Sequence, residues 1–164
     1  MPSESPTPAG TSEIAIRPFR AEDQQFLARV APRMHPGQTA SPRDPAILDR
    51  FFSGLADGNF LSKPGAQAFV ATINGQACGV ISFSPDRDYF TDHPRVYVDS
   101  LVLAQESEGK GVGRALLDYV ERWAREHGFR EVVLDVFAGN QRAIAFYERQ
   151  GYRPDHIRMA KPLD

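Results

Sequence analysis

The residues best placed to bind an anion form a glycine-rich run, Gly109-Lys110-Gly111-Val112-Gly113. The run follows an apolar, β-rich stretch at residues 95–103 and precedes a helical pattern that continues to about His127. Glycine lets the backbone adopt positive φ and approach a ligand closely. The first N–H groups of a helix have no partner within that helix, and the helix dipole adds positive potential at the same end. The run therefore predicts a site for a phosphate or a pyrophosphate.

The spacing of these glycines differs from two phosphate-binding patterns. The P-loop pattern needs a Lys-Ser/Thr pair after its last glycine, and no such pair is present here. The dinucleotide pattern G-x-G-x-x-G meets Arg114 or Leu116 where its third glycine belongs. On this run alone, an ordinary tight turn between a strand and a helix remains an open interpretation.

A resemblance to a known family rests on three segments taken together. Residues 108–113 match the pattern Gln/Arg-x-x-Gly-x-Gly/Ala except at the first position. The pattern Asn-x-x-Ala-x-x-Phe-Tyr-x-x-x-Gly-Tyr follows at residues 140–152, and residues 16–23 match an opening strand and turn. Over about residues 13–161 the chain resembles the GNAT superfamily of acetyl-CoA-dependent N-acetyltransferases.

The resemblance implies an α/β fold, with a central mixed β-sheet and helices on both faces. Two strands of that sheet splay apart to admit the pantetheine arm of acetyl-CoA. Backbone N–H groups near Leu101 and Leu103 would bind the arm and form an oxyanion hole for the acetyl oxygen, and the amide of Asn140 would contact the arm. The implied cofactor-binding residues are Leu101, Val102, Leu103, Glu108, Gly109, Lys110, Gly111, Val112, Gly113, Arg114 and Asn140.

One of these positions departs from the family pattern, because Glu108 stands where the family carries Gln or Arg. A carboxylate there lies near the implied pyrophosphate. We expect the backbone N–H to make the contact and the carboxylate to turn to solvent. Lys110 and Arg114 are the expected cations that offset its charge.

The implied catalytic residues are Asp99 and Tyr147. A lysine-like amine has a pKa of about 10.4 and must lose a proton before it attacks. By position in the family pattern, Asp99 is a base acting through water, an ammonium ligand, or a structural carboxylate. Tyr147 matches the family's general acid, whose phenol protonates or hydrogen-bonds the departing thiolate. Strand alternation places Tyr97, Asp99, Leu101 and Leu103 on one side of the sheet, unless a bulge interrupts it.

The elements that must position these residues follow from apolar periodicity and turn residues. Asn74-Gly75 between two apolar runs predicts a β-hairpin. The expected order is β-α-α-β-β-β-α-β-α-β. Strands are expected at residues 14–19, 68–73, 77–83, 95–103, 131–136 and 152–161, helices at 22–30, 46–55, 112–127 and 140–150, and loops at 32–45 and 84–94.

Composition limits the other possibilities. A chain of 164 residues predicts a single N-acetyltransferase domain at 13–164, after a disordered leader at 1–12 rich in Pro, Ser and Thr. A net charge of −2 argues against nucleic acid as a partner, and no apolar run is long enough for a membrane span. The single cysteine, Cys78, is expected to be buried, and the histidines lack metal-ligand spacing. A cytoplasmic protein without a metal is therefore expected.

The resemblance predicts that an acetyl group passes from acetyl-CoA to a primary amine by direct attack in a ternary complex, without a covalent enzyme intermediate. The alternative is a non-catalytic acyl-CoA-binding module with the same fold. The acceptor is a small-molecule or peptide amine, and residues 24–63 and 84–95 are expected to select it. A homodimer is also possible, because dimers are common among the proteins that the chain resembles.

Overall fold

The computed structural model describes residues 13–37 and 41–163, so the expected leader at 1–12 lies outside the described residues. Within the described part, five strands form one mixed sheet in the order β1-β2-β3-β4-β5. The first four strands pair antiparallel, and β5 pairs parallel to β4. The strands are β1 (Ile14–Pro18), β2 (Gln67–Ile73), β3 (Gln76–Arg87), β4 (Pro94–Leu103) and β5 (Val132–Leu134).

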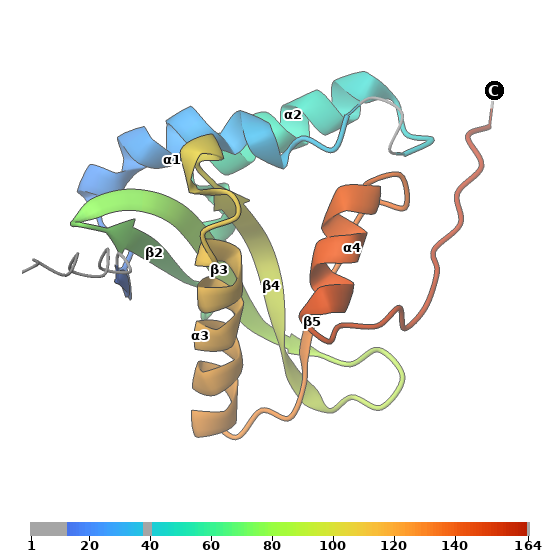
Figure 1. Cartoon of the computed structure of the whole chain (residues 1–164). Helices are drawn as coiled ribbons and strands as arrows, with labels where there is room; N and C mark the ends of the chain where they lie inside the picture. Colours follow the sequence, from blue (N-terminus) through green and yellow to red (C-terminus); the bar gives the residue numbers. More distant parts are fainter. Residues whose placement is uncertain (1–12, 38–40, 164) are drawn as a thin grey trace, which may run out of the picture.

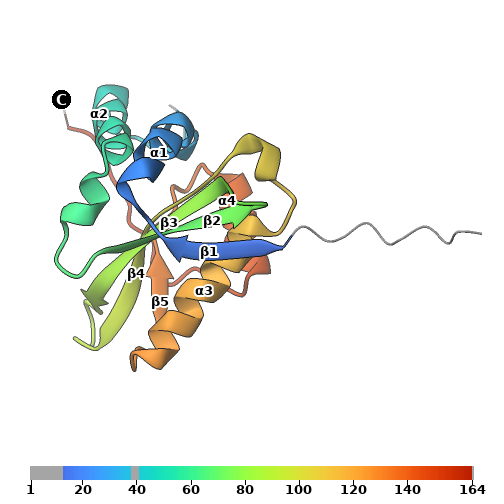
Figure 2. The ribbon, with the colours of Figure 1, turned by 90° about the vertical axis from the view of Figure 1, so that its left-hand side faces the viewer.

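Helices cover both faces of this sheet, as expected (Figures 1 and 2). Side chains of α1 and α2 pack on one face with β2, β3 and the end of β4, and those of α3 and α4 pack on the other. The α-helices are α1 (Gln24–Val30), α2 (Pro45–Ala56), α3 (Val112–Glu126) and α4 (Gln141–Arg149). Short 3-10 turns are η1 (Ala21–Asp23), η2 (Ala31–Met34), η3 (Asn59–Ser62) and η4 (Gln105–Ser107).

The expected strand at residues 152–161 is wrong. Residues 152–163 have no regular secondary structure, and Ile157 and Met159 are 81% and 90% exposed. The alternation of apolar residues is a local signal, whereas a strand also needs a neighbouring edge with which to pair. Pro154 and Pro162 further remove two backbone donors from the segment.

The hairpin that joins β3 to β4 is longer than expected. Residues 84–87 belong to β3 and pair with residues 94–97 of β4, although the sequence predicted a loop from 84 to 94. The guanidinium of Arg95 lies 2.7 Å from Asp86 and 2.9 Å from Asp88, which ties the two strands together where the loop begins. At the other edge, β5 covers only Val132–Leu134 of the expected 131–136.

A β-bulge interrupts β4 at Asp99. Ser100 pairs with Ser82 of β3, but Val98 pairs with the next residue, Phe83, so Asp99 is the extra residue. A bulge of one residue changes which side chains face each side of the sheet beyond it.

The bulge overturns the expectation that Tyr97, Asp99, Leu101 and Leu103 share one side. Leu101 and Leu103 pack against the α3-side core, where Val98 also lies. Tyr97 and Asp99 instead both contact Lys63, which directly follows η3 on the α2 side of the sheet.

A bidentate ion pair fixes the path of the chain from β1 into α1. Arg17 donates two hydrogen bonds of 2.7 Å to Asp23, whose side chain is only 4% exposed. Asp23 also accepts a 2.8 Å hydrogen bond from the backbone of Arg20. The hydrogen bond from Arg17 is the main cause that holds the pKa of Asp23 below its ordinary value.

We predict that Asp23→Asn lowers the free energy of unfolding at pH 7 by about 1–3 kcal/mol, because it removes a charge-assisted pair. A lowered folded-state pKa means that Asp23 stabilises the fold above its unfolded pKa of about 3.9. That stabilisation is lost as the pH falls through the lower folded-state pKa. Urea denaturation of both proteins between pH 3 and 8 should therefore show a difference that shrinks below about pH 4.

The matched control is Glu22→Gln, which removes a neighbouring carboxylate from the exposed pair with Arg20. It should change stability little at any pH. Equal stabilities of wild type and Asp23→Asn at pH 7 would contradict the assignment.

Candidate functional site

The glycine-rich run forms the turn between η4 and α3, as the sequence predicted. Gly109 and Gly111 have φ of +74° and +79°, and Gly111 is the N-cap residue of α3. A Cβ at either position would meet no atom within 4 Å. The backbone conformation, rather than crowding, therefore requires glycine at these two positions, and the space above the turn is open to a ligand.

Gly113 has a different role. It lies in the first turn of α3, where a Cβ would be 3.0 Å from Cζ of Phe146 on α4 and 3.5 Å from a methyl of Leu103 on β4. Its missing side chain lets α4 and β4 approach the helix start closely. A larger residue at 113 thus perturbs packing, whereas a larger residue at Gly111 enters open space.

The strands β4 and β5 diverge beside this turn. They pair only at residues 96–98 of β4 and 132–134 of β5. The C-terminal part of β4, residues 99–103, has no β5 partner among the described residues. The expected cofactor-binding residues Leu101, Val102 and Leu103 lie on this unpaired stretch, which leads through η4 into the glycine turn (Figure 1).

Glu108 remains partly exposed to solvent, with its side chain 31% exposed, and two arginines hold its carboxylate. Its carboxylate accepts hydrogen bonds from Arg33 of η2 and Arg142 of α4. The hydrogen bond from Arg142 is the largest cause that lowers the pKa of Glu108. The cations paired with Glu108 are thus Arg33 and Arg142 and not the expected Lys110 and Arg114, and Arg114 pairs with Asp118 one turn along α3.

Sequence reasoning missed both arginines. Arg33 lies in a segment expected to be a loop, and it also donates a 2.9 Å hydrogen bond from Nε to the carbonyl of Leu103. These contacts join residues 70 and 75 positions apart, so no local pattern reports them. Arg142 carried a weak signal, because it follows Asn140 in the first turn of the helix that the motif predicts.

Asn140 is the N-cap residue of α4, and its Oδ1 accepts a 3.2 Å hydrogen bond from the backbone of Ala143. This cap satisfies one of the free donors at the helix start. The side-chain oxygen is thus engaged in the fold, and the amide NH₂ is the group that can donate to a ligand.

Tyr147 lies on α4 against the α3-side core. Its ring is 5.2 Å from that of Phe146 and 6.0 Å from that of Tyr152. Burial raises the pKa of Tyr147 to about 12. The phenol therefore stays protonated at neutral pH and can donate a hydrogen bond.

Asp99 lies on the opposite face of the sheet from Tyr147. Its side chain is only 4% exposed, and one oxygen, Oδ1, accepts a hydrogen bond from Lys63. The other oxygen, Oδ2, is buried with no hydrogen-bond partner in the part of the chain that the structure describes. The two expected catalytic side chains thus lie on opposite faces of the sheet.

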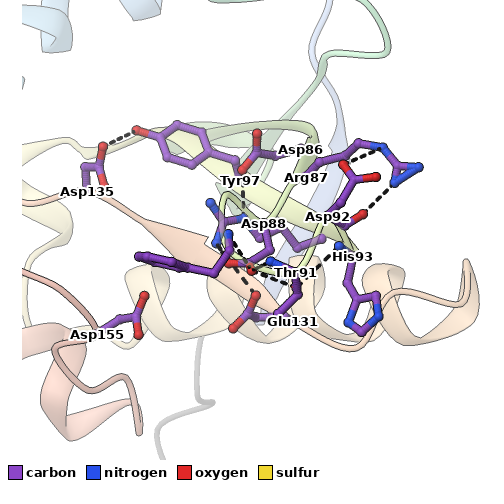
Figure 3. Close-up of polar contacts among 12 residues, drawn as sticks. Asp86, Arg87, Asp88, Thr91, Asp92, His93, Tyr97, Glu131, Asp135 and Asp155 are labelled. Atoms are coloured by element: carbon purple, nitrogen blue, oxygen red, sulfur yellow. Dashed lines mark hydrogen bonds and ion pairs between the residues drawn. The ribbon is translucent and has the colours of Figure 1, made fainter.

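Tyr97 completes the surroundings of Asp99. Its ring centroid is 5.1 Å from Nζ of Lys63, and its hydroxyl donates a 3.2 Å hydrogen bond to Asp135 just beyond β5 (Figure 3). Burial, followed by the charge of Asp135, raises the pKa of Tyr97. This cluster of an aromatic ring and carboxylates is suited to a cation.

Three further observations concern groups outside this site. Cys78 is buried, as predicted, and its thiol donates to the carbonyl of Ala71. Among residues 13–37 and 41–163, no group of three His, Cys, Asp or Glu side chains is placed to hold a metal ion. No helix in that same part of the chain combines the length and hydrophobicity needed to span a membrane.

Comparison with known proteins identifies a family match. The model of the acetyltransferase (GNAT) family matches residues 27–152. An uncharacterized N-acetyltransferase of Bacillus subtilis, YdgE, is 36% identical over 73 residues, which cover 43% of this chain and 46% of the relative. The mouse N-acetyltransferase 8F1 is 27% identical over 95 residues, which cover 58% of this chain and 43% of the relative. The matched regions thus span less than half the length of these relatives.

Solved structures share the fold. A GCN5-related N-acetyltransferase from Ralstonia eutropha superposes with a TM-score of 0.65 at 20% identity, covering 92% of this chain and 99% of that one. The aminoglycoside N-acetyltransferase AAC(6')-Iy in complex with CoA gives a TM-score of 0.69 at 19% identity, covering 95% and 98%. These similarities confirm the expected fold.

The arrangement around Glu108 generates a prediction that uses CoA as the probe. Two arginines already neutralise the carboxylate, so Glu108→Gln should change the Kd for CoA by less than about threefold. Arg142→Gln leaves Glu108 with a single partner and should weaken binding about two- to fivefold, the size of an exposed ion pair. In the Glu108→Gln background, the loss caused by Arg142→Gln should be smaller.

Isothermal titration calorimetry measures these constants. Arg125→Gln is the control, because it breaks a comparable exposed pair with Glu121 at the far end of α3 and should leave the Kd unchanged. If Glu108→Gln tightened binding about tenfold or more, the carboxylate would be opposing the ligand rather than organising the arginines.

Proposed function

Because the chain belongs to the acetyltransferase (GNAT) family, we propose that it transfers an acetyl group from acetyl-CoA to a primary amine bound in the same complex. The observation that carries the proposal is the open glycine turn at the start of α3, next to the stretch of β4 that β5 leaves unpaired. A turn of this kind binds a pyrophosphate, and an unpaired strand edge supplies donors and acceptors for an amide-containing arm.

At the cofactor end, backbone N–H groups of residues 111–114 bind the pyrophosphate. The pair of Arg33 and Arg142 leaves one net positive charge after Glu108 is counted, so this end of the site favours an anion. The amide of Asn140 donates to the pantetheine arm, which lies along residues 101–103. A backbone N–H of that stretch holds the acetyl oxygen as negative charge develops on it.

The acceptor amine approaches from the face that carries Asp99. Its nitrogen lone pair attacks the thioester carbon, and the C–S bond then breaks, so the electron pair leaves on the CoA sulfur. Asp99 binds the ammonium form and receives, through water, the proton that the ammonium must lose before it attacks. The second proton leaves the nitrogen as the C–S bond breaks and passes to solvent water. No covalent bond to the protein is formed, because the amine attacks directly.

Tyr147 acts at the leaving group as a hydrogen-bond donor. Full proton transfer from a phenol with a pKa of about 12 to a thiolate near 8.5 is uphill by about 5 kcal/mol. A hydrogen bond to the thiolate has no such cost. Of the two roles that the sequence left open for this tyrosine, the raised pKa of its phenol favours stabilisation of the thiolate.

Enzymatic transfer and simple acyl-CoA binding are separated by following CoA thiol release with a panel of primary amines. The panel should include alkylamines, diamines, lysine peptides, peptide N-termini and aminoglycosides, since AAC(6')-Iy carries an aminoglycoside acetyltransferase name. Amine-dependent release of CoA supports the proposal. Tight binding of acetyl-CoA without release with any amine would instead identify a non-catalytic module.

The anion site is tested at Gly111. Gly111→Asp places a negative charge in the open space above the turn and should weaken acetyl-CoA binding by at least about tenfold. Gly111→Asn is the matched control, because asparagine has the same size and also tolerates positive φ. The rise in Tm caused by acetyl-CoA should be nearly lost in the first variant and largely kept in the second. Equal rises in both variants and the wild type would remove the pyrophosphate from this turn.

The role of Tyr147 is tested with Tyr147→Phe. Loss of one hydrogen bond to a charged group should lower kcat about 10- to 100-fold, with little change in the Kd for acetyl-CoA. Because the pKa of Tyr147 is about 12, the pH profiles of kcat for the two proteins should run parallel between pH 7 and 10. An alkaline limb in that range that disappears in the variant would show that Tyr147 is a general acid. Unchanged kcat, with chemistry rate-limiting, would leave it a packing residue.

A further inference from the structure

Lys63 reaches into the candidate acceptor site from the solvent side. It directly follows η3, and its Nζ contacts both the carboxylate of Asp99 and the face of Tyr97. The side chain of Lys63 is 52% exposed, whereas that of Asp99 is 4% exposed. The ammonium of Lys63 can therefore return to water easily, whereas the carboxylate of Asp99 cannot. A buried carboxylate is costly without a partner, so Asp99 needs a cation beside it.

Lys63 satisfies only half of the Asp99 carboxylate. Oδ2 is buried and has no partner in the described parts of the chain. A carboxylate oxygen only accepts hydrogen bonds, and a primary ammonium carries three donors. A small ammonium that enters this space has donors for both oxygens, whereas Lys63 is tethered to one.

The charges around this space also favour a cation. Asp135 accepts a hydrogen bond from the hydroxyl of Tyr97 (Figure 3). The negative charge of Asp86 also lies close enough to help raise the pKa of that hydroxyl. The charge of Asp86 is neutralised by Arg95. The two negative charges of Asp99 and Asp135 then face the single positive charge of Lys63. A second negative group on the acceptor would meet these carboxylates and be disfavoured.

We propose that the butylammonium side chain of Lys63 stands in for the acceptor, so that the acceptor is a cationic primary alkylamine which displaces Lys63 from Asp99 and Tyr97. The inference deepens the proposed function and rests on it, because only that function makes the bound amine an acceptor. Lys63 is thus an internal competitor that lowers the apparent affinity for the amine by the fraction of time it is in place.

Lys63→Ala removes the competitor and leaves a space with the shape of n-butylamine. The KM for n-butylamine should fall about tenfold, which corresponds to Lys63 being in place about nine-tenths of the time. Lys63→Met, which keeps an unbranched chain without the charge, should give a smaller fall. Lys161→Ala, in the exposed C-terminal segment, is the control that should leave KM unchanged.

Binding without turnover provides a second readout. Millimolar n-butylammonium chloride should raise the Tm of Lys63→Ala more than that of the wild type, and n-butanol, the neutral analogue, should not. The rise should be lost in the double variant Lys63→Ala/Asp99→Asn. In the wild type, n-butylammonium should increase the rate at which acetic anhydride labels Lys63, with Lys110 and Lys161 as internal references for mass spectrometry.

The outcomes separate the possibilities. A higher KM, or a lower kcat with a shifted pH profile, in both Lys63 variants would overturn the proposal and make Lys63 a positioning residue for Asp99. Absence of n-butylammonium binding to a folded Lys63→Ala protein would overturn it as well. If no amine is acetylated by any variant, the proposed function fails, while the binding and labelling results still decide whether this is an ammonium site.

Discussion

One extra residue in β4 determines how the rest of the site is arranged. The bulge at Asp99 lets Val98 and Leu101 pack into the same core although they are three positions apart. Asp99 and Tyr97 thereby face the α2 side, while Leu101 faces the α3 side. Without the bulge, regular alternation would place either the carboxylate or the leucines on the wrong face. The bulge thus places a buried carboxylate where β4 and β5 part.

The divergence of β4 and β5 gives the two ends of this stretch opposite electrostatic character. Toward η4, the chain leads into the glycine turn and toward Arg33 and Arg142. Toward the bulge, the chain leads to Asp99 and to Tyr97, whose hydroxyl donates a hydrogen bond to Asp135. An anionic ligand and a cationic ligand can therefore bind at opposite ends of one strand, with their reacting groups brought together between them.

Features that depend on neighbouring residues were predictable, and those that depend on distant ones were not. Asn74 and Gly75 both have positive φ in the hairpin that the sequence predicted, and the turn at Gly109 and Gly111 follows from the same local constraint. The bulge at Asp99 could not be read from β4 alone, because it is defined by the register with β3. The partners of Glu108 come from η2 and α4, and the partner of Asp99 directly follows η3. Local patterns cannot join these distant segments to residues 99 and 108. The strand predicted at residues 152–161 failed for the same reason, since local alternation does not establish pairing with a neighbouring strand.

The two internal ion pairs of the site differ in a way that bears on how ligands enter. At Glu108, two arginines share one carboxylate, so positive charge is left over and an anion can bind while the group stays intact. At Asp99, one lysine binds one oxygen of a buried carboxylate, and a second cation has no place until Lys63 leaves. The group at Glu108 is thus ready to bind an anion, whereas the carboxylate of Asp99 already binds a cation. In the exchange that we propose, the acceptor ammonium replaces that of Lys63, and the exposed stem of Lys63 keeps the cost of its release small.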